Sequence, residues 1–193
     1  MRIAEFDRDE VLRNAMEAFR AKGYAKTTMQ ELVAATGLHP GSIYGAFGNK
    51  RGLLLAAVDH YVEGKRTLRR ALLDNPSPLA GLAAYLDGIV GEALCGSCLV
   101  TRTMMELSEQ DEELTQRVKG IYGELELDLA ELLTQAQAKG ELAPDSNIHT
   151  LTALLLINLQ GLITFAQCRP DRPLLGDYVV EQGAIGAALG EGD

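Results

Sequence analysis

Two short segments between Gly23 and Lys50 limit most strongly what this chain can fold into. Each has about seven residues of helical composition, and Gly37 separates them. Isolated helices shorter than about 12 residues are marginally stable in water, so neither segment can fold alone. Both must pack against longer helices, and the flanking segments 9–22 and 50–73 have the required helical spacing of apolar residues.

Sequence signals mark the ends of these short helices. Thr27 and Thr28 offer N-cap oxygens, and Glu31 follows Thr28 by three residues in the pattern of a capping box. Gly37 permits a tight turn, and Pro40 suits the first turn of the next helix because its missing N–H costs nothing there. The pattern predicts a helix-turn-helix, whose second helix enters the major groove of DNA.

Helical periodicity covers the rest of the chain, and no strand pattern of alternating Val, Ile or Thr occurs. The stretch Asp74-Asn75-Pro76-Ser77-Pro78 is the strongest domain boundary. We predict an all-α fold of about nine helices, with a head over 1–49, a connecting helix over 50–74 and a body over 75–193. The predicted helices span 9–22, 29–35, 40–47, 50–73, 79–94, 98–107, 112–139, 148–168 and 174–189.

The net charge of −9 is unevenly distributed along the 193 residues. Residues 1–73 carry 12 basic and 8 acidic side chains, whereas residues 74–193 carry 6 and 19. A cationic head on an anionic body predicts that only the head meets phosphate, although so small an excess is also compatible with scatter. No run of about 18 apolar residues and no signal peptide occur, which predicts a cytoplasmic protein without membrane attachment.

From Gly23 the chain reads Gly-Tyr-Ala-Lys-Thr-Thr, and from Gly37 it reads Gly-Leu-His-Pro-Gly-Ser-Ile-Tyr-Gly-Ala-Phe-Gly-Asn-Lys. The order and spacing of these residues resemble the signature of the TetR family of transcriptional repressors. The resemblance covers about the first 60 residues, and the body matches only in length and helical layout. It implies a homodimeric repressor that binds double-stranded operator DNA through its head and a small-molecule effector through its body.

The resemblance also implies roles for single residues of the head. Thr27, Thr28, Tyr44 and Lys50 would contact phosphates. Taken singly, Tyr44 could be aromatic core and Lys50 a solvated helix start, but their joint spacing favours DNA contact. The residues expected at base edges share one short helix and its start: His39, Pro40 and Ser42. Many relatives carry a large polar residue after the tyrosine, where this chain has Gly45, so fewer side-chain contacts are available.

The segment 148–168 is apolar nearly all round, and the predicted helix 174–189 is rich in Gly and Ala. Such helices must be covered on nearly all sides, either by a partner subunit or by a monomeric core. We expect a two-fold interface of two helices from each subunit. Two recognition helices about one DNA turn apart would then match a palindromic operator, and a ligand that changes their separation would release the DNA.

The expected effector contacts lie on the predicted helices of the body, although each could instead be plain core. They are Tyr85, Met104, Met105, Tyr122, Asn158 and Phe165. Cys95 and Cys98 form a Cys-Gly-Ser-Cys pair, and Cys98 falls near a helix N-terminus, which lowers a thiol's pKa. Some TetR-like regulators with a cysteine opening this helix respond to electrophiles or oxidants, so the pair is a possible redox sensor or only core.

Two other classes of function fit the sequence less well than DNA binding. A thiol oxidoreductase using Cys95 and Cys98 lacks the surrounding βαβ pattern, and no cluster of His, Asp or Glu indicates acid–base catalysis. A helical adaptor that does not bind DNA leaves the segment from Thr27 to Lys50 unexplained. The sequence therefore predicts a regulator that is not an enzyme and that needs no cofactor and no metal.

Overall fold

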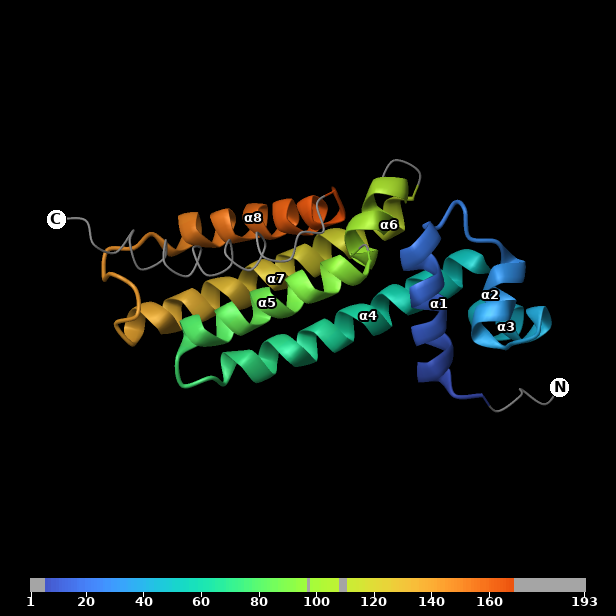
Figure 1. Ribbon diagram of the computed structural model, residues 1–193, viewed down its shortest axis with the longest axis horizontal. Helices are drawn as coiled ribbons and strands as arrows, with labels where there is room; N and C mark the ends of the chain where they lie inside the picture. The colour runs from blue at the N-terminus through green and yellow to red at the C-terminus, as the bar shows by residue number, and fades with distance from the viewer. Residues whose placement is uncertain (1–5, 97, 108–110, 169–193) are drawn as a thin grey trace. The chain divides into compact units, whose positions relative to one another are not determined.

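The computed structural model describes residues 6–96, 98–107 and 111–168, which form eight helices and contain no strand (Figure 1). The helices are α1 (Arg8–Lys22), α2 (Met29–Thr36), α3 (Pro40–Phe47), α4 (Lys50–Leu73), α5 (Pro78–Cys95), α6 (Leu99–Leu107), α7 (Glu112–Ala138) and α8 (Ile148–Cys168). The predicted all-α fold is confirmed. The predicted helix 174–189 lies outside the described residues.

The short helices end where the sequence signals predict. Thr28 caps α2 through a complete capping box with Glu31, and Gly37 closes the helix in the left-handed conformation with φ 68°. His39 caps α3, because its Nδ1 accepts a hydrogen bond of 3.2 Å from the N–H of Gly41, and Pro40 occupies the first turn. Local hydrogen bonds therefore fix the boundaries of α2 and α3.

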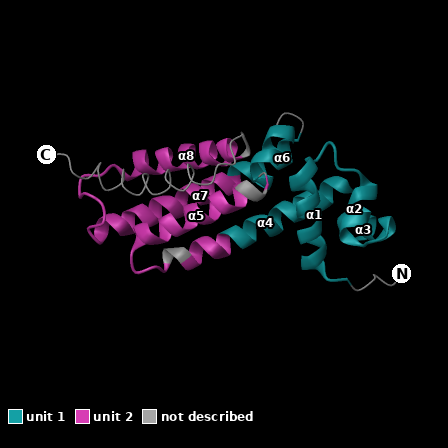
Figure 2. Ribbon diagram, in the orientation of Figure 1, with its two compact units in different colours: residues 1–65, 97–119 teal, residues 66–96, 120–193 magenta. Residues whose placement is uncertain are grey.

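The chain divides into two compact units (Figure 2). Unit 1 comprises residues 1–65 and 97–119, which include α1, α2, α3, the first part of α4, α6 and the start of α7. Unit 2 comprises residues 66–96 and 120–193, which include the end of α4, α5, most of α7 and α8. The helix α4 thus contributes residues to both units.

In unit 1 the two short helices depend on longer neighbours for burial. The only fully inaccessible side chain of α2 is Leu32, and that of α3 is Ile43. Burying one such side chain contributes about 1.5–3 kcal/mol, which is too little to hold a helix of eight residues. The remaining core comes mainly from α1, α4 and α6, with Phe19, Leu53, Leu54, Val58 and Leu99 fully buried.

In unit 2, α5 packs against α8 through a cluster formed by Val90, Ala93, Leu162 and Ala166. The guanidinium of Arg69 pairs with Asp128 at 2.7 Å, which ties the end of α4 to α7. Within the described part, the segment 148–166 of α8 is long and apolar enough to cross a membrane by length and composition, which is weak evidence by itself.

Candidate nucleic-acid interface

The outward face of α3 lies opposite the buried Ile43. Its exposed residues are Gly41, Tyr44 and Gly45, and the Tyr44 side chain is 50% exposed. His39 is exposed at the start of the helix, while Pro40 and Ser42 are partly buried at its edges. Because Nδ1 of His39 accepts the N–H of Gly41, the neutral imidazole carries its proton on Nε2, a donor available to an external acceptor.

The two threonines before α2 have different environments. Thr27 is only 1% exposed, and its hydroxyl donates to the carbonyl of Gly23 at 2.6 Å. Thr28 is exposed, and its hydroxyl oxygen accepts the N–H of Glu31 at 3.2 Å. We therefore assign Thr27 to the support of the turn before α2, in place of the phosphate contact expected from the sequence, because its hydroxyl is directed inward.

The carboxylate of Glu31 accepts hydrogen bonds at the N-terminus of α2. It accepts the N–H of Thr28 at 2.8 Å and the ammonium of Lys22. The hydrogen bond from Lys22, followed by those from Thr28, lowers the pKa of Glu31 from 4.5 to about 2. Glu31 is therefore ionised at neutral pH, and a DNA phosphate approaching this helix end meets its charge.

Lys50 begins α4 and is held by an aromatic ring. Its ammonium lies 4.3 Å from the ring centroid of Tyr24, which is a cation–π contact. Burial lowers the pKa of Lys50, and the carboxylates of Glu106 and Glu31 oppose that shift. The sequence marked Lys50 as a phosphate contact but gave no sign of Tyr24 as its support.

The comparisons with known proteins cover both parts of the chain. Residues 11–57 match the family model described as bacterial regulatory proteins of the tetR family, and residues 79–176 match that of the tetracyclin repressor-like C-terminal domain. The chain is 30% identical to the HTH-type transcriptional repressor ComR of Escherichia coli (strain K12) over 163 residues, which is 81% of this chain and 78% of ComR. The chain belongs to the TetR family. The resemblance predicted from the head is thus confirmed and extends to the body.

Other TetR-family relatives match over greater lengths. An uncharacterised HTH-type transcriptional regulator of Bacillus subtilis (strain 168), YezE, is 30% identical over 188 residues, which is 92% of this chain and 95% of YezE. A cysteine-substituted form of the TetR family transcriptional regulator CifR, solved with 26-base-pair double-strand operator DNA, is 30% identical with a TM-score of 0.83. That match covers 95% of this chain and 98% of CifR. This TetR-family chain is therefore a DNA-binding transcriptional regulator.

Helix α6 contacts the DNA-binding head of this TetR-family chain through two charged side chains. The carboxylate of Glu106 accepts the N–H of Ala25 at 3.0 Å, and the guanidinium of Arg102 donates to the carbonyl of Arg20 at 2.8 Å. A Cβ built at Gly23 would lie 2.0 Å from Glu106 Oε1, so the turn between α1 and α2 rests directly on α6. Sequence reasoning missed these contacts because about 80 residues separate the partners.

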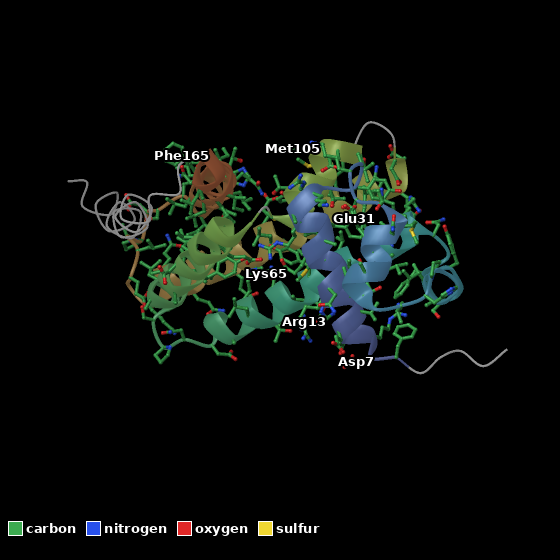
Figure 3. All side chains as sticks on the ribbon, turned by 45° about the vertical axis from the view of Figure 1, so that its right-hand side comes forward. Asp7, Arg13, Glu31, Lys65, Met105 and Phe165 are labelled. Carbon is green, nitrogen blue, oxygen red and sulfur yellow. The ribbon has the colours of Figure 1, made fainter. Side chains whose placement is uncertain are left out.

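Cys98 lies at the other end of α6, among polar side chains from α4. Its carbonyl accepts the N–H of Arg102 at 3.0 Å, which places the cysteine at the N-terminus of the helix. The hydroxyl of Tyr61 donates to Cys98 Sγ at 3.8 Å, and the ammonium of Lys65 lies 5.4 Å from the Tyr61 ring centroid (Lys65 is labelled in Figure 3). Burial lowers the pKa of Lys65, and the negative charge of a Cys98 thiolate opposes that shift. The side chain of Cys95 lies outside the described residues.

The expected effector contacts fall in different environments. Met105 is 71% exposed on α6 and Phe165 is 45% exposed on α8 (both labelled in Figure 3), so neither lines an interior in this chain. Tyr85 is buried, and the hydroxyl of Tyr122 accepts the side-chain amide of Gln160 at 2.6 Å. Met104 and Asn158 are partly buried. The structure adds Gln160, the partner of Tyr122, which the sequence did not single out.

Proposed function

We propose that this chain is a repressor that binds a palindromic operator as a homodimer and leaves it when an effector acts on the body or on Cys98. The observation that carries the proposal is the exposed face of α3, with Tyr44 projecting from it and Lys50 held at the start of the next helix. A short helix with its apolar side buried and its other side open fits the recognition element of a helix-turn-helix.

On this surface we assign phosphate contacts to Tyr44 and Lys50, and to Thr28, whose hydroxyl donates to the Glu31 carboxylate at 3.1 Å and must exchange that partner for a phosphate oxygen. Hydroxyl and ammonium donors bind phosphate oxygens regardless of sequence and set the position of the helix on the duplex. Base contacts fall to His39, through its Nε2 donor, and to Ser42 and Pro40 at the edges of α3. Few side chains on this surface can donate to bases, which makes the approach of the helix backbone important.

The exposed face of α8 supports the homodimer. Leu154, Ile157, Gly161 and Phe165 are exposed and follow one another at intervals of three or four residues, so they form one stripe along the helix. The opposite side of α8 is already covered by α5. A second copy of the same stripe, related by a two-fold axis, would remove this apolar surface from water.

A dimer also fits the operator length seen for a relative. The duplex bound to CifR has 26 base pairs, which is more than two turns of B-DNA. Two recognition helices separated by about one turn, roughly 34 Å, therefore fit on a duplex of that length. By analogy, we assign one half-site to the α3 of each subunit of this protein.

The effector response is assigned to α6. Cys98 lies at its N-terminus, and Arg102 and Glu106 farther along the helix hold the head. An electrophile or oxidant that modifies the thiol adds bulk beside Tyr61 and Lys65, so the helix must shift. Because Glu106 binds the turn before α2, that shift would move the head and change the separation of the two recognition helices.

A reversible effector would instead contact unit 2. Tyr85, Tyr122 and Asn158 remain assigned to such a ligand, together with Gln160. Met105 and Phe165 are left out because of their exposure. In either case the activity is regulation of binding, and no catalytic step is assigned to the chain.

Selection of genomic fragments bound by the purified protein, followed by fluorescence-anisotropy titration, tests the proposal. We expect an enriched sequence with two-fold symmetry, bound at least a thousandfold more tightly than a scrambled duplex. Addition of a thiol-reactive compound should release the enriched duplex. Equal affinity for the enriched and the scrambled duplex would refute operator recognition.

A further inference from the structure

The outward face of α3 is nearly bare backbone. Gly41 and Gly45 are both exposed on it, four residues apart, and Tyr44 is the one large side chain that they flank. A helix of eight residues with two internal glycines is weakened, because each glycine costs about 1 kcal/mol relative to alanine. Such a sequence needs a physical reason.

The fold itself does not require glycine at position 45. The described glycines with positive φ include Gly37 and Gly48, but not Gly45. A Cβ built at Gly45 would have no described neighbour within 4 Å, whereas one at Gly52 would lie 1.9 Å from the carbonyl oxygen of Phe47. Alanine is therefore compatible with both the conformation and the space at Gly45, in contrast to Gly48 and Gly52.

We propose that Gly45 is a specificity-determining position, whose missing side chain lets the α3 backbone approach the base edges of the operator. This inference rests on the proposed function, in which α3 enters the major groove. Glycine is the residue that permits the closest contact between a backbone and a ligand. The bare face of α3 thus reads the shape of the groove floor, and Ser42 and His39 read the bases beside it.

A methyl group at position 45 should weaken operator binding by increasing the distance between the α3 backbone and the base edges. A Cβ projects about 1.5 Å from the backbone, so it holds the helix farther from the bases. Direct hydrogen bonds need separations of about 2.7–3.2 Å and are lost by 3.6 Å. The contacts of Ser42 and His39 would therefore be lost even though both side chains are unchanged. Phosphate contacts in a non-specific complex do not need this depth and should persist.

The test compares Gly45→Ala with a matched control, Gly64→Ala, in the full-length protein. Gly64 is also an exposed helical glycine with no described atom within 4 Å of a built Cβ, and it lies on α4. We expect Gly45→Ala to bind the selected operator about tenfold more weakly, with affinity for a scrambled duplex changed less than about twofold. The melting temperature should equal or exceed that of the wild type, because alanine favours the helix. Gly64→Ala should share the thermal effect and keep wild-type operator affinity.

Two results would overturn the inference. One is a Gly45→Ala protein that binds the operator as tightly as wild type. The other is a Gly45→Ala protein with a lower melting temperature, since the fold would then require the glycine. The wild-type titration distinguishes a failure of this inference from a failure of the proposed function. A wild-type protein that binds operator and scrambled duplexes equally would refute both the proposed function and the inference about Gly45. A Gly45→Ala protein that discriminates the two duplexes as well as wild type does would refute the inference alone.

Discussion

Helices α3 and α8 each expose an aromatic side chain to a similar extent, yet their surfaces differ in chemistry. Tyr44 on α3 is 50% exposed and stands between glycines, whereas Phe165 on α8 is 45% exposed and continues a stripe with Leu154 and Ile157. A phenol hydroxyl beside bare backbone fits a polar, charged partner, and an apolar stripe fits a second apolar surface. Exposure alone does not identify a site, because the neighbours of the exposed residue decide what it can bind.

The largest expected effect is on the α8 surface. Ile157→Glu places a charge in the middle of the stripe, where Ile157 is 68% exposed, and should convert the proposed dimer to a monomer by sedimentation. Operator affinity should fall about a hundredfold or more, because the two half-sites are no longer bound together. Leu127→Glu is the control, since Leu127 is 71% exposed on α7 outside the stripe. A dimeric Ile157→Glu protein would show that α8 is not the interface.

The next largest effect concerns the thiol of Cys98, which belongs to neither the α3 surface nor the α8 surface. A maleimide should weaken operator binding by wild type about 5–150-fold, the usual range of allosteric coupling, and should leave Cys98→Ser unaffected. Cys95→Ser distinguishes a single reactive thiol from a reactive pair. This variant should still respond to a maleimide. It would lose its response to peroxide only if that response requires a disulfide between Cys95 and Cys98. Equal release of wild type and Cys98→Ser would exclude Cys98 as the sensor.

Substitutions of Tyr44 in α3 and of Lys50 at the start of α4 test the proposed DNA-contacting surface. Lys50→Ala and Tyr44→Ala should each weaken binding to operator and scrambled duplexes alike by about tenfold, since hydrogen bonds to charged groups contribute about 1.5–3 kcal/mol. For Lys50→Ala the slope of log affinity against log salt should fall by about 1. Lys119→Ala, an exposed lysine on α7, is the control for a general loss of positive charge. Unchanged affinity in both variants would remove these residues from the interface.

The smallest effects distinguish the two threonines before α2. Thr28→Ala removes an N-cap and should lower the free energy of unfolding by about 1 kcal/mol and also weaken DNA binding. Thr27→Val keeps the shape of a buried side chain but removes its hydrogen bond to Gly23, so it should cost about 1 kcal/mol of stability with little effect on DNA affinity. Urea unfolding and anisotropy measure the two quantities. A loss of DNA affinity confined to Thr27→Val would reverse the assignment.

The sequence predicted the local features of the head because local chemistry determines them. The capping box of Thr28, the left-handed Gly37 and the first-turn Pro40 each depend on residues within four positions. The body lacks such signals. Whether Phe165 or Met105 lines an interior or faces outward depends on how α8 and α6 pack, and apolar periodicity does not distinguish a ligand contact from a subunit interface.

Contacts between distant segments were also beyond the sequence. Glu106 reaches the N–H of Ala25 across 81 positions, and Tyr61 reaches Cys98 across 37. Nothing in either segment alone specifies the partner, because the contact arises only after α6 has packed on α1. The sequence thus predicted candidate DNA contacts and a candidate sensor cysteine, and the structure adds the contacts of Arg102 and Glu106 that join α6 to the head.

The central claim is that two copies of α3 bind one duplex together. Sedimentation of the protein with a selected operator duplex, at protein concentrations near the dissociation constant, measures how many subunits each duplex holds. We expect two subunits per duplex, bound in a single step. We also expect loss of that complex when the spacing between half-sites is lengthened by five base pairs, about half a turn. A complex of one subunit per duplex, or one that tolerates the insertion without loss of affinity, would contradict it.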